Sequence, residues 1–211
     1  MSSTRLILIR HAHAAGNGWD GTLLGGRTDA PLSTRGREQL HRLQARLRGT
    51  APFAAIYSSP LLRAHGTATA LDQVGLGPVR LCPALQEIDC GNLDGMSLDR
   101  IKRSHPRLWD AHLHQADEDF RWPGGESYRQ FRSRCLRAVR SVAAAHRGAQ
   151  VALVTHAGVV NQLLGFLAGA SAAAWEPFRP GNTAVTVVEW LRGSGTVVAF
   201  DDRSHLPAEW R

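Results

Sequence analysis

The stretch Leu6-Ile7-Leu8-Ile9-Arg10-His11 decides the fold of this 211-residue chain. Four apolar residues without a polar interruption are typical of a strand that is buried on both faces of a parallel sheet. A second apolar run, over residues 150–155, ends directly before His156. Because ligands gather at the carboxyl ends of the strands in such sheets, we expect Arg10, His11 and His156 to meet at one edge.

The rest of the chain alternates between strand and helix patterns. Strands are predicted over 5–10, 53–58, 78–82, 150–155, 183–190 and 196–201, and helices over 33–48, 60–74, 126–147 and 157–168. This alternation predicts an α/β fold, a three-layer α/β/α sandwich with a mostly parallel central sheet. A polar helical stretch at 97–114, broken at Pro106, predicts a small helical insert over the carboxyl edge at about 92–125. We therefore expect a single domain spanning 1–211 with this insert.

The composition limits the classes of partner. The formal net charge is +7, and Lys102 is the only lysine among the 25 basic residues. Such a surplus of arginine fits either the composition of a GC-rich genome or an anionic partner, because arginine binds phosphate bidentately. No basic run is interleaved with aromatic residues, so we expect no nucleic-acid partner.

The cysteine pattern and the hydropathy indicate the compartment. Three cysteines, an odd number without a C-x-x-C pair, form neither a disulfide framework nor a zinc site. No apolar stretch approaches the roughly 18 residues that cross a bilayer. The few apolar residues before Arg10 are too short a run for a signal peptide. We expect a cytoplasmic protein without membrane association.

Further groups suited to phosphate follow at wide intervals. They are Asn17, Arg63 in the first turn of a helix after a strand, and Glu87. Together with Arg10, His11 and His156, they make a set that could move a phosphoryl group without a metal. Each also has an ordinary structural interpretation: a turn-forming asparagine, surface arginines and an exposed glutamate, or histidines bonded at strand ends.

Three other motifs do not lead to a site. The glycines from Gly16 to Gly21 spell G-x-G-x-x-G, but they do not lie directly between a strand and a helix. The pair His11 and His13 lacks the further ligands that a metal hydrolase needs. Ser58-Ser59 lacks the G-x-S-x-G context of a nucleophile elbow.

Six motifs, in the right order, resemble the histidine phosphatase superfamily, which includes the cofactor-dependent phosphoglycerate mutases. They are Leu8-Ile9-Arg10-His11-Ala12 with Asn17, Gly26-Arg27-Thr28-Asp29-Ala30-Pro31-Leu32-Ser33-Thr34-Arg35-Gly36, Ser58-Ser59-Pro60-Leu61-Leu62-Arg63-Ala64, Leu85-Gln86-Glu87 with Gly91, Pro123-Gly124-Gly125-Glu126-Ser127 and Val154-Thr155-His156-Ala157-Gly158. The chain departs from the pattern at Ala12 and Ala157, where glycine is commonest. Leu93-Asp94 replaces the usual Trp-Glu pair, so we expect a different substrate wall.

The resemblance implies a role for each candidate. His11 would attack phosphorus and form a phosphohistidine, which requires a neutral imidazole. Its ordinary pKa of about 6.5 would be lowered by Arg10 and Arg63. Arg10, Asn17, Arg63 and His156 would bind the phosphate. Glu87, or the neighbouring Asp89, would give a proton to the leaving group. Arg27 and Glu126 are interpreted as structural.

The function implied is hydrolysis of small phosphorylated metabolites without metal or cofactor. The alternatives are a phosphoglycerate mutase and a catalytically idle anion-binding protein on the same fold. The short insert and the end of the chain soon after His205 favour hydrolysis, and the α-ribazole phosphatase branch is the nearest that we would name. The natural substrate and the oligomeric state, including a homodimer, are left open.

Overall fold

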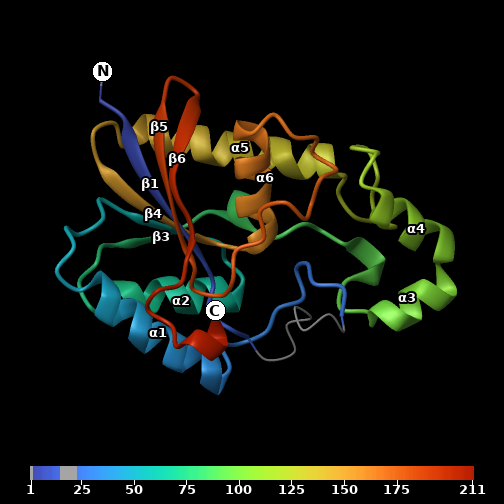
Figure 1. Ribbon diagram of the computed structural model, residues 1–211, viewed down its shortest axis with the longest axis horizontal. Coiled ribbons are helices and arrows are strands. Elements are labelled where there is room, and N and C mark those ends of the chain that lie inside the picture. The colour runs from blue at the N-terminus through green and yellow to red at the C-terminus, as the bar shows by residue number, and fades with distance from the viewer. Residues whose placement is uncertain (1, 15–22) are drawn as a thin grey trace.

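The fold is a sheet covered by helices on both faces (Figure 1). The computed structural model describes residues 2–14 and 23–211, so the expected phosphate ligand Asn17 lies outside the described residues. The strands are β1 (Thr4–Arg10), β2 (Ile56–Ser58), β3 (Val79–Leu81), β4 (Gln150–Thr155), β5 (Val185–Leu191) and β6 (Ser194–Asp202). In the described part of the chain they form one sheet in the order β3-β2-β4-β1-β5-β6. The first four of these positions pair in parallel, and β5 runs antiparallel to both neighbours.

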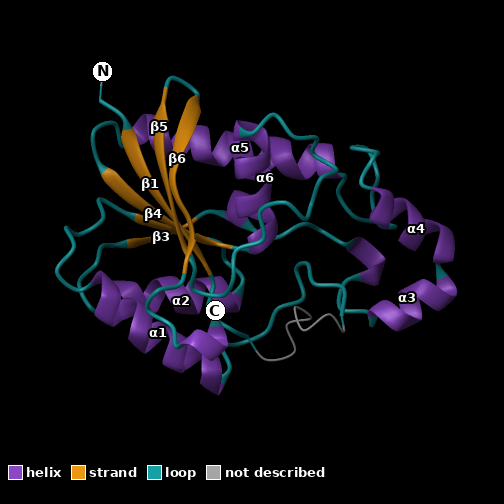
Figure 2. Ribbon diagram, in the orientation of Figure 1, coloured by secondary structure: helices purple, strands orange, loops and turns teal. Residues whose placement is uncertain are grey.

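The centre of strand β1, from Leu6 to Ile9, is apolar because both of its faces are covered. Leu6 and Leu8 pack into the core beneath α5 (Tyr128–Ala145) and α6 (Ala157–Leu167). Ile7 and Ile9 belong to the opposite core, beneath α1 (Thr34–Leu47) and α2 (Leu62–Asp72). Figure 2 shows the two helical layers on either side of the strands. The predicted three-layer sandwich with a mostly parallel sheet is confirmed.

The stretch at 92–125 contains two short helices that stand beside the sheet. They are α3 (Leu98–Ser104) and α4 (Pro106–His114), and the break falls at Pro106 as predicted. They pack on a third apolar cluster, which includes Ile101, Phe120 and Trp122. Short 3-10 turns, η2 (Pro83–Leu85), η3 (Gly91–Leu93) and η4 (Ala208–Trp210), complete the described elements. No helix in the described ranges is long and apolar enough to cross a membrane.

Helix α1 starts at its predicted capping residue, whereas α2 starts later than the sequence predicts. Ser33 accepts a hydrogen bond from the backbone of Gly36 at the start of α1, as its position predicts. The helix expected from Pro60 begins later, at Leu62. The backbone N–H of Ser59 still bonds to Val154 of β4, at 3.1 Å, so the chain stays extended past the end of β2. This extension leaves Arg63 at the second position of α2.

Candidate active site

The carboxyl ends of β1, β2 and β4 bring the expected residues together. Arg10 ends β1, His156 follows β4, and Arg63 lies in α2 directly after β2. The rings of His11 and His156 have their centroids 5.1 Å apart. Arg10, His11, Arg63, Glu87 and His156 are between 1% and 5% exposed. Five groups with strong polar chemistry are therefore buried at one edge of the sheet.

The hydrogen bonds of His11 fix its tautomer. Its Nδ1 lies 2.8 Å from the carbonyl oxygen of Ala12. A carbonyl can only accept, so Nδ1 carries the proton and donates it. The backbone N–H of His11 bonds to Thr155 of β4 at 2.9 Å, which anchors the residue to the sheet. The ring is held with Nε2 as the unprotonated, nucleophilic nitrogen.

Burial and neighbouring cations keep His11 neutral. Its pKa lies well below the ordinary value of 6.5, first because the ring is desolvated and second because Arg10 and Arg63 repel a positive charge. The arginines act as the sequence predicted, but the larger cause is burial. An imidazole in this setting is a free nucleophile at neutral pH.

His156 is held by a serine that the sequence had not singled out. Its Nε2 lies 2.8 Å from Oγ of Ser59, while Oγ also accepts the backbone N–H of Leu61. Burial and the nearby His11 and Arg63 lower the pKa of His156 well below its usual value. Its Nδ1 is buried without a hydrogen-bond partner among the described residues. When the serine donates to Nε2, Nδ1 keeps the single proton and can donate it to a bound oxyanion.

The two arginines are anchored through backbone carbonyls. Arg63 donates to Thr28 and to Gly26, at 2.8 Å in each case, and its buried Nε has no partner in the described part of the chain. Arg10 donates to the carbonyl of Pro180 at 2.7 Å. Burial lowers the pKa of Arg10 to about 9, so its guanidinium is still charged at neutral pH. Anchored cations of this kind are suited to a phosphoryl group.

Glu87 faces the first turn of α6. Its Oε2 accepts the N–H of Gly158 at 3.0 Å, and its Oε1 accepts the N–H of Ile88 at 2.9 Å. Burial raises the pKa of the carboxyl above 4.5, against the opposing effect of these two N–H groups and of Arg63. A side chain at position 158 would collide with the carboxylate, since a Cβ there would lie 2.2 Å from Oε1. Only glycine allows this approach.

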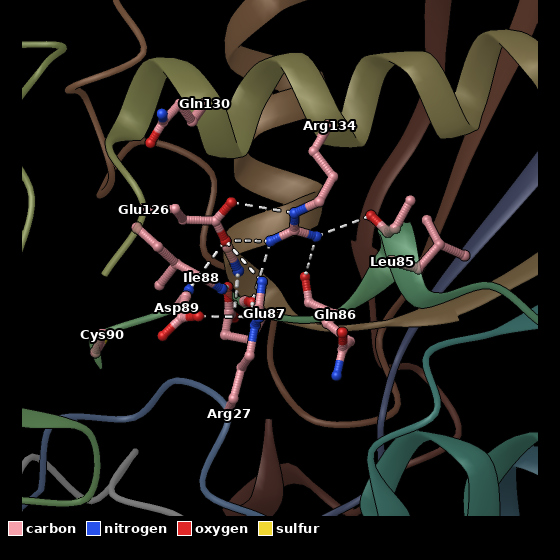
Figure 3. Close-up of polar contacts among 12 residues, drawn as sticks. Arg27, Leu85, Gln86, Glu87, Ile88, Asp89, Cys90, Glu126, Gln130 and Arg134 are labelled. Carbon is pink, nitrogen blue, oxygen red and sulfur yellow. Dashed lines mark hydrogen bonds and ion pairs between the residues drawn. The ribbon is translucent and has the colours of Figure 1, made fainter. Parts of the chain in front are cut away.

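A charged network holds the backbone on either side of Glu87 (Figure 3). Arg134 of α5 donates to the carbonyls of Ala84 and Gln86, both at 2.9 Å, and to that of Glu87 at 3.2 Å. It also pairs with Glu126, which accepts the backbone N–H of Asp89 at 3.0 Å. Arg134 is therefore a positioning residue for the segment that carries Glu87.

The same network gives the neighbouring carboxylates of Glu87 and Asp89 different surroundings. Asp89 pairs with Arg27 at 3.0 Å and accepts the N–H of Gly91 at 2.9 Å. Arg27 also contacts Glu126, at 3.3 Å. The side chains of Asp89, Arg27 and Glu126 are thus engaged with one another and with the backbone, whereas the buried carboxyl of Glu87 accepts the N–H of Gly158, two residues after His156. Glu87 is therefore the better candidate of the two carboxylates for a proton donor.

The described side chains contain no cluster of three or more histidine, cysteine or carboxylate groups that could hold a metal ion. Cys82, Cys90 and Cys135 are free thiols; the first is half-buried and the other two are buried. The positive charge at the described site is carried by the guanidinium groups of Arg10 and Arg63.

A family model described as histidine phosphatase superfamily (branch 1) matches residues 6–203. The chain belongs to this superfamily. The family and the enzyme class expected from the sequence, a phosphatase of this superfamily, are confirmed. The six motifs that suggested it, from Leu8 to Gly158, lie within the matched residues.

Curated relatives include both a phosphatase and a mutase. A metal-independent phosphoserine phosphatase of Arabidopsis thaliana is 29% identical, with 96% of this chain and 83% of the relative covered. A probable phosphoglycerate mutase, GpmB, of Salmonella choleraesuis is 27% identical, with 97% and 95% covered. Among solved structures, YhfR of Bacillus stearothermophilus has a TM-score of 0.86 at 32% identity, with 96% and 98% covered.

Sequence reasoning found the charged groups and missed those that hold them. Ser59 lies inside a quoted motif, next to Pro60, and its position in that motif was the available signal. Gly158 lies inside another. Arg134 is one of several arginines along α5, and only the fold distinguishes it from its exposed neighbours.

Proposed function

We propose that the chain hydrolyses phosphomonoesters of small metabolites through a phosphohistidine on His11. The observation that carries this proposal is the fixed tautomer of His11. Its proton is held by Ala12, so Nε2 is free to attack, and the ring lies buried beside His156 and two anchored arginines. Phosphoryl transfer needs mainly such positioning and charge stabilisation.

In the first step Nε2 of His11 forms a bond to phosphorus while the ester P–O bond breaks. The leaving alkoxide takes the proton of Glu87, since burial raises the pKa of this carboxyl and so favours its protonated form. Arg10, Arg63 and Nδ1 of His156 stabilise the equatorial oxygens. The amide of Asn17, a ligand expected from the sequence, would assist them.

In the second step water attacks the phosphohistidine, and the P–N bond breaks. The carboxylate of Glu87 accepts a proton from that water. The N–H groups of Ile88 and Gly158 stabilise its negative charge between the two steps. Inorganic phosphate then leaves, and the neutral imidazole of His11 is regenerated.

A mutase is the second candidate, because phosphoglycerate mutases are among the relatives. A mutase would return the phosphoryl group to a bound phosphoglycerate instead of to water. We favour hydrolysis because phosphatases recur both among the relatives and among the solved structures of similar fold. An idle anion-binding protein would not need a buried carboxyl with a raised pKa, such as that of Glu87. A cytoplasmic location and a homodimer stay predictions.

Rapid-quench turnover of p-nitrophenyl phosphate labelled in its phosphoryl group tests the proposal. We expect an acid-labile, labelled adduct on the wild-type chain, no adduct in His11→Ala, and unchanged turnover in chelator. An adduct and turnover that survive the His11 replacement would refute the mechanism. Rapid conversion of 3-phosphoglycerate to 2-phosphoglycerate with a trace of bisphosphoglycerate would reassign the chain as a mutase.

A further inference from the structure

A cavity of about 270 Å³ opens from the catalytic edge. Glu87 and Gly158 line its catalytic end. Its walls are mostly apolar, and their aromatic residues come from the insert, from α5 and from the segment after α6. They include Trp109, His112, Trp122, Tyr128, Phe131 and Trp175. The position of the proton donor at its end makes this cavity the place for the alcohol part of a substrate.

The aromatic wall is held rigid by its own contacts. The rings of His112 and Trp175 stack with centroids 4.5 Å apart and an angle of 6° between planes. Nε1 of Trp175 donates to the carbonyl of His112 at 3.1 Å, and Nδ1 of His112 bonds to the hydroxyl of Tyr128 at 2.6 Å. A wall fixed in advance loses little freedom when it binds a flat group.

The cavity offers few polar groups to a ligand. The amide of Asn161 is already bonded to Ala174 and Phe178, and that of Gln162 to Arg132 and Ala172. Burial and Arg179 lower the pKa of His112 to about 4, so its ring is neutral at pH 7.

Among the described residues that line the cavity, Glu87 supplies a carboxyl group and Arg179 a guanidinium group. Arg179 is exposed, and its charge acts on both Glu87 and Arg10. The guanidinium carbon of Arg179 also lies 5.3 Å from the ring centroid of Trp175, so this charge lies between the catalytic end and the aromatic wall. An ammonium group, or a carboxylate placed away from Arg179, would lose its hydration without a partner, which is costly.

The volume suits a ring system. An apolar protein cavity of about 150 Å³ holds benzene, and this one is larger at about 270 Å³. Resting on the proposed function, we propose that this cavity selects phosphomonoesters whose leaving alcohol carries a bulky, planar, apolar group. Small polar esters such as phosphoserine or phosphoglycerate are then poor substrates.

The test compares 2-naphthylmethyl phosphate with phosphoserine, since both esters release a primary alcohol. We expect kcat/KM to favour the naphthyl ester by about 30-fold or more, from the apolar area that it buries. Trp175→Ala and Trp109→Ala lower this preference by about 10-fold. Trp210→Ala, which removes the same side chain outside the cavity, leaves it unchanged.

Inhibition of the wild-type chain provides a second measurement that needs no variant. We expect 2-naphthylmethylphosphonate to bind about 30-fold more tightly than methylphosphonate. Equal affinities, together with phosphoserine as the better substrate, would overturn the assignment of the cavity and leave the hydrolase intact. If neither ester is hydrolysed, the proposed function itself fails.

Discussion

Glu87, the proposed proton donor, lies so close to Gly158 that the substitution Gly158→Ala must displace its carboxyl group. A Cβ at this position would lie 2.2 Å from Oε1, 2.9 Å from Cδ and 3.0 Å from Oε2 of Glu87. Non-bonded carbon–oxygen contacts begin near about 3.3 Å, so the carboxyl must retreat by about 1 Å. Misplacement of a catalytic group by this distance costs about 10²-fold in rate.

The assay separates proton donation from the rest of the reaction. For an alkyl phosphate, kcat/KM reports formation of the phosphohistidine, and we expect it to fall about 10²-fold in Gly158→Ala. For p-nitrophenyl phosphate the loss is smaller, because nitrophenolate leaves without a proton. Circular dichroism melting verifies that the variant is folded.

Gly66→Ala is the matched control. Gly66 lies within α2, and a Cβ there would meet only Leu32 among the described neighbours, at 3.2 Å from its Cδ1. We expect this control to keep its activity on both esters. A folded Gly158→Ala protein with undiminished kcat/KM on the alkyl ester would refute the assignment of Glu87 as proton donor.

Three further predictions address the groups around the reaction. For an alkyl ester, we expect kcat/KM to depend on pH as a bell-shaped curve. Activity is lost when the pH falls through the lowered pKa of His11, and it is lost again when the pH rises through the raised pKa of Glu87. Glu87→Gln therefore removes the alkaline limb of the curve. Arg134→Met shifts the alkaline limb and lowers the free energy of unfolding, measured in urea, by about 3 kcal/mol. The control Arg137→Met, at an exposed position, changes neither quantity. An alkaline limb that does not move in Arg134→Met would contradict the positioning role of Arg134. Ser59→Ala lowers kcat/KM by about 10-fold and Ser59→Thr restores it, in steady-state assays; an unaffected Ser59→Ala enzyme would exclude the serine from orienting its histidine.

The sequence predicts the sheet because its strands carry a physical signature. An apolar run such as Leu6 to Ile9 has no polar face to expose, so it must lie between two layers. The convergence of His11, Arg63 and His156 follows, since parallel strands share a carboxyl edge. The division into one domain with an insert at about 92–125 stays a prediction.

The rest depends on contacts between segments that no local pattern records. Arg134 has the same spacing and charge as its exposed neighbours on α5, and only the tertiary fold directs it at the carbonyls around Glu87. Burial is the main cause of the lowered pKa of His11. The spacing of residues along the sequence does not show how deeply a side chain is buried. The pairing of Trp175 with His112 joins residues far apart in the chain.

The two halves of the pocket rest on different parts of the architecture. The residues at the phosphate end follow strands β1, β2 and β4, and the pairing of these strands fixes their positions. Two aromatic residues of the opposite wall, Trp109 and His112, belong to α4, a short helix beside the sheet (Figure 1). Residues at 98–114 can therefore be exchanged, in evolution or by engineering, to change the substrate specificity while the residues at the phosphate end stay the same.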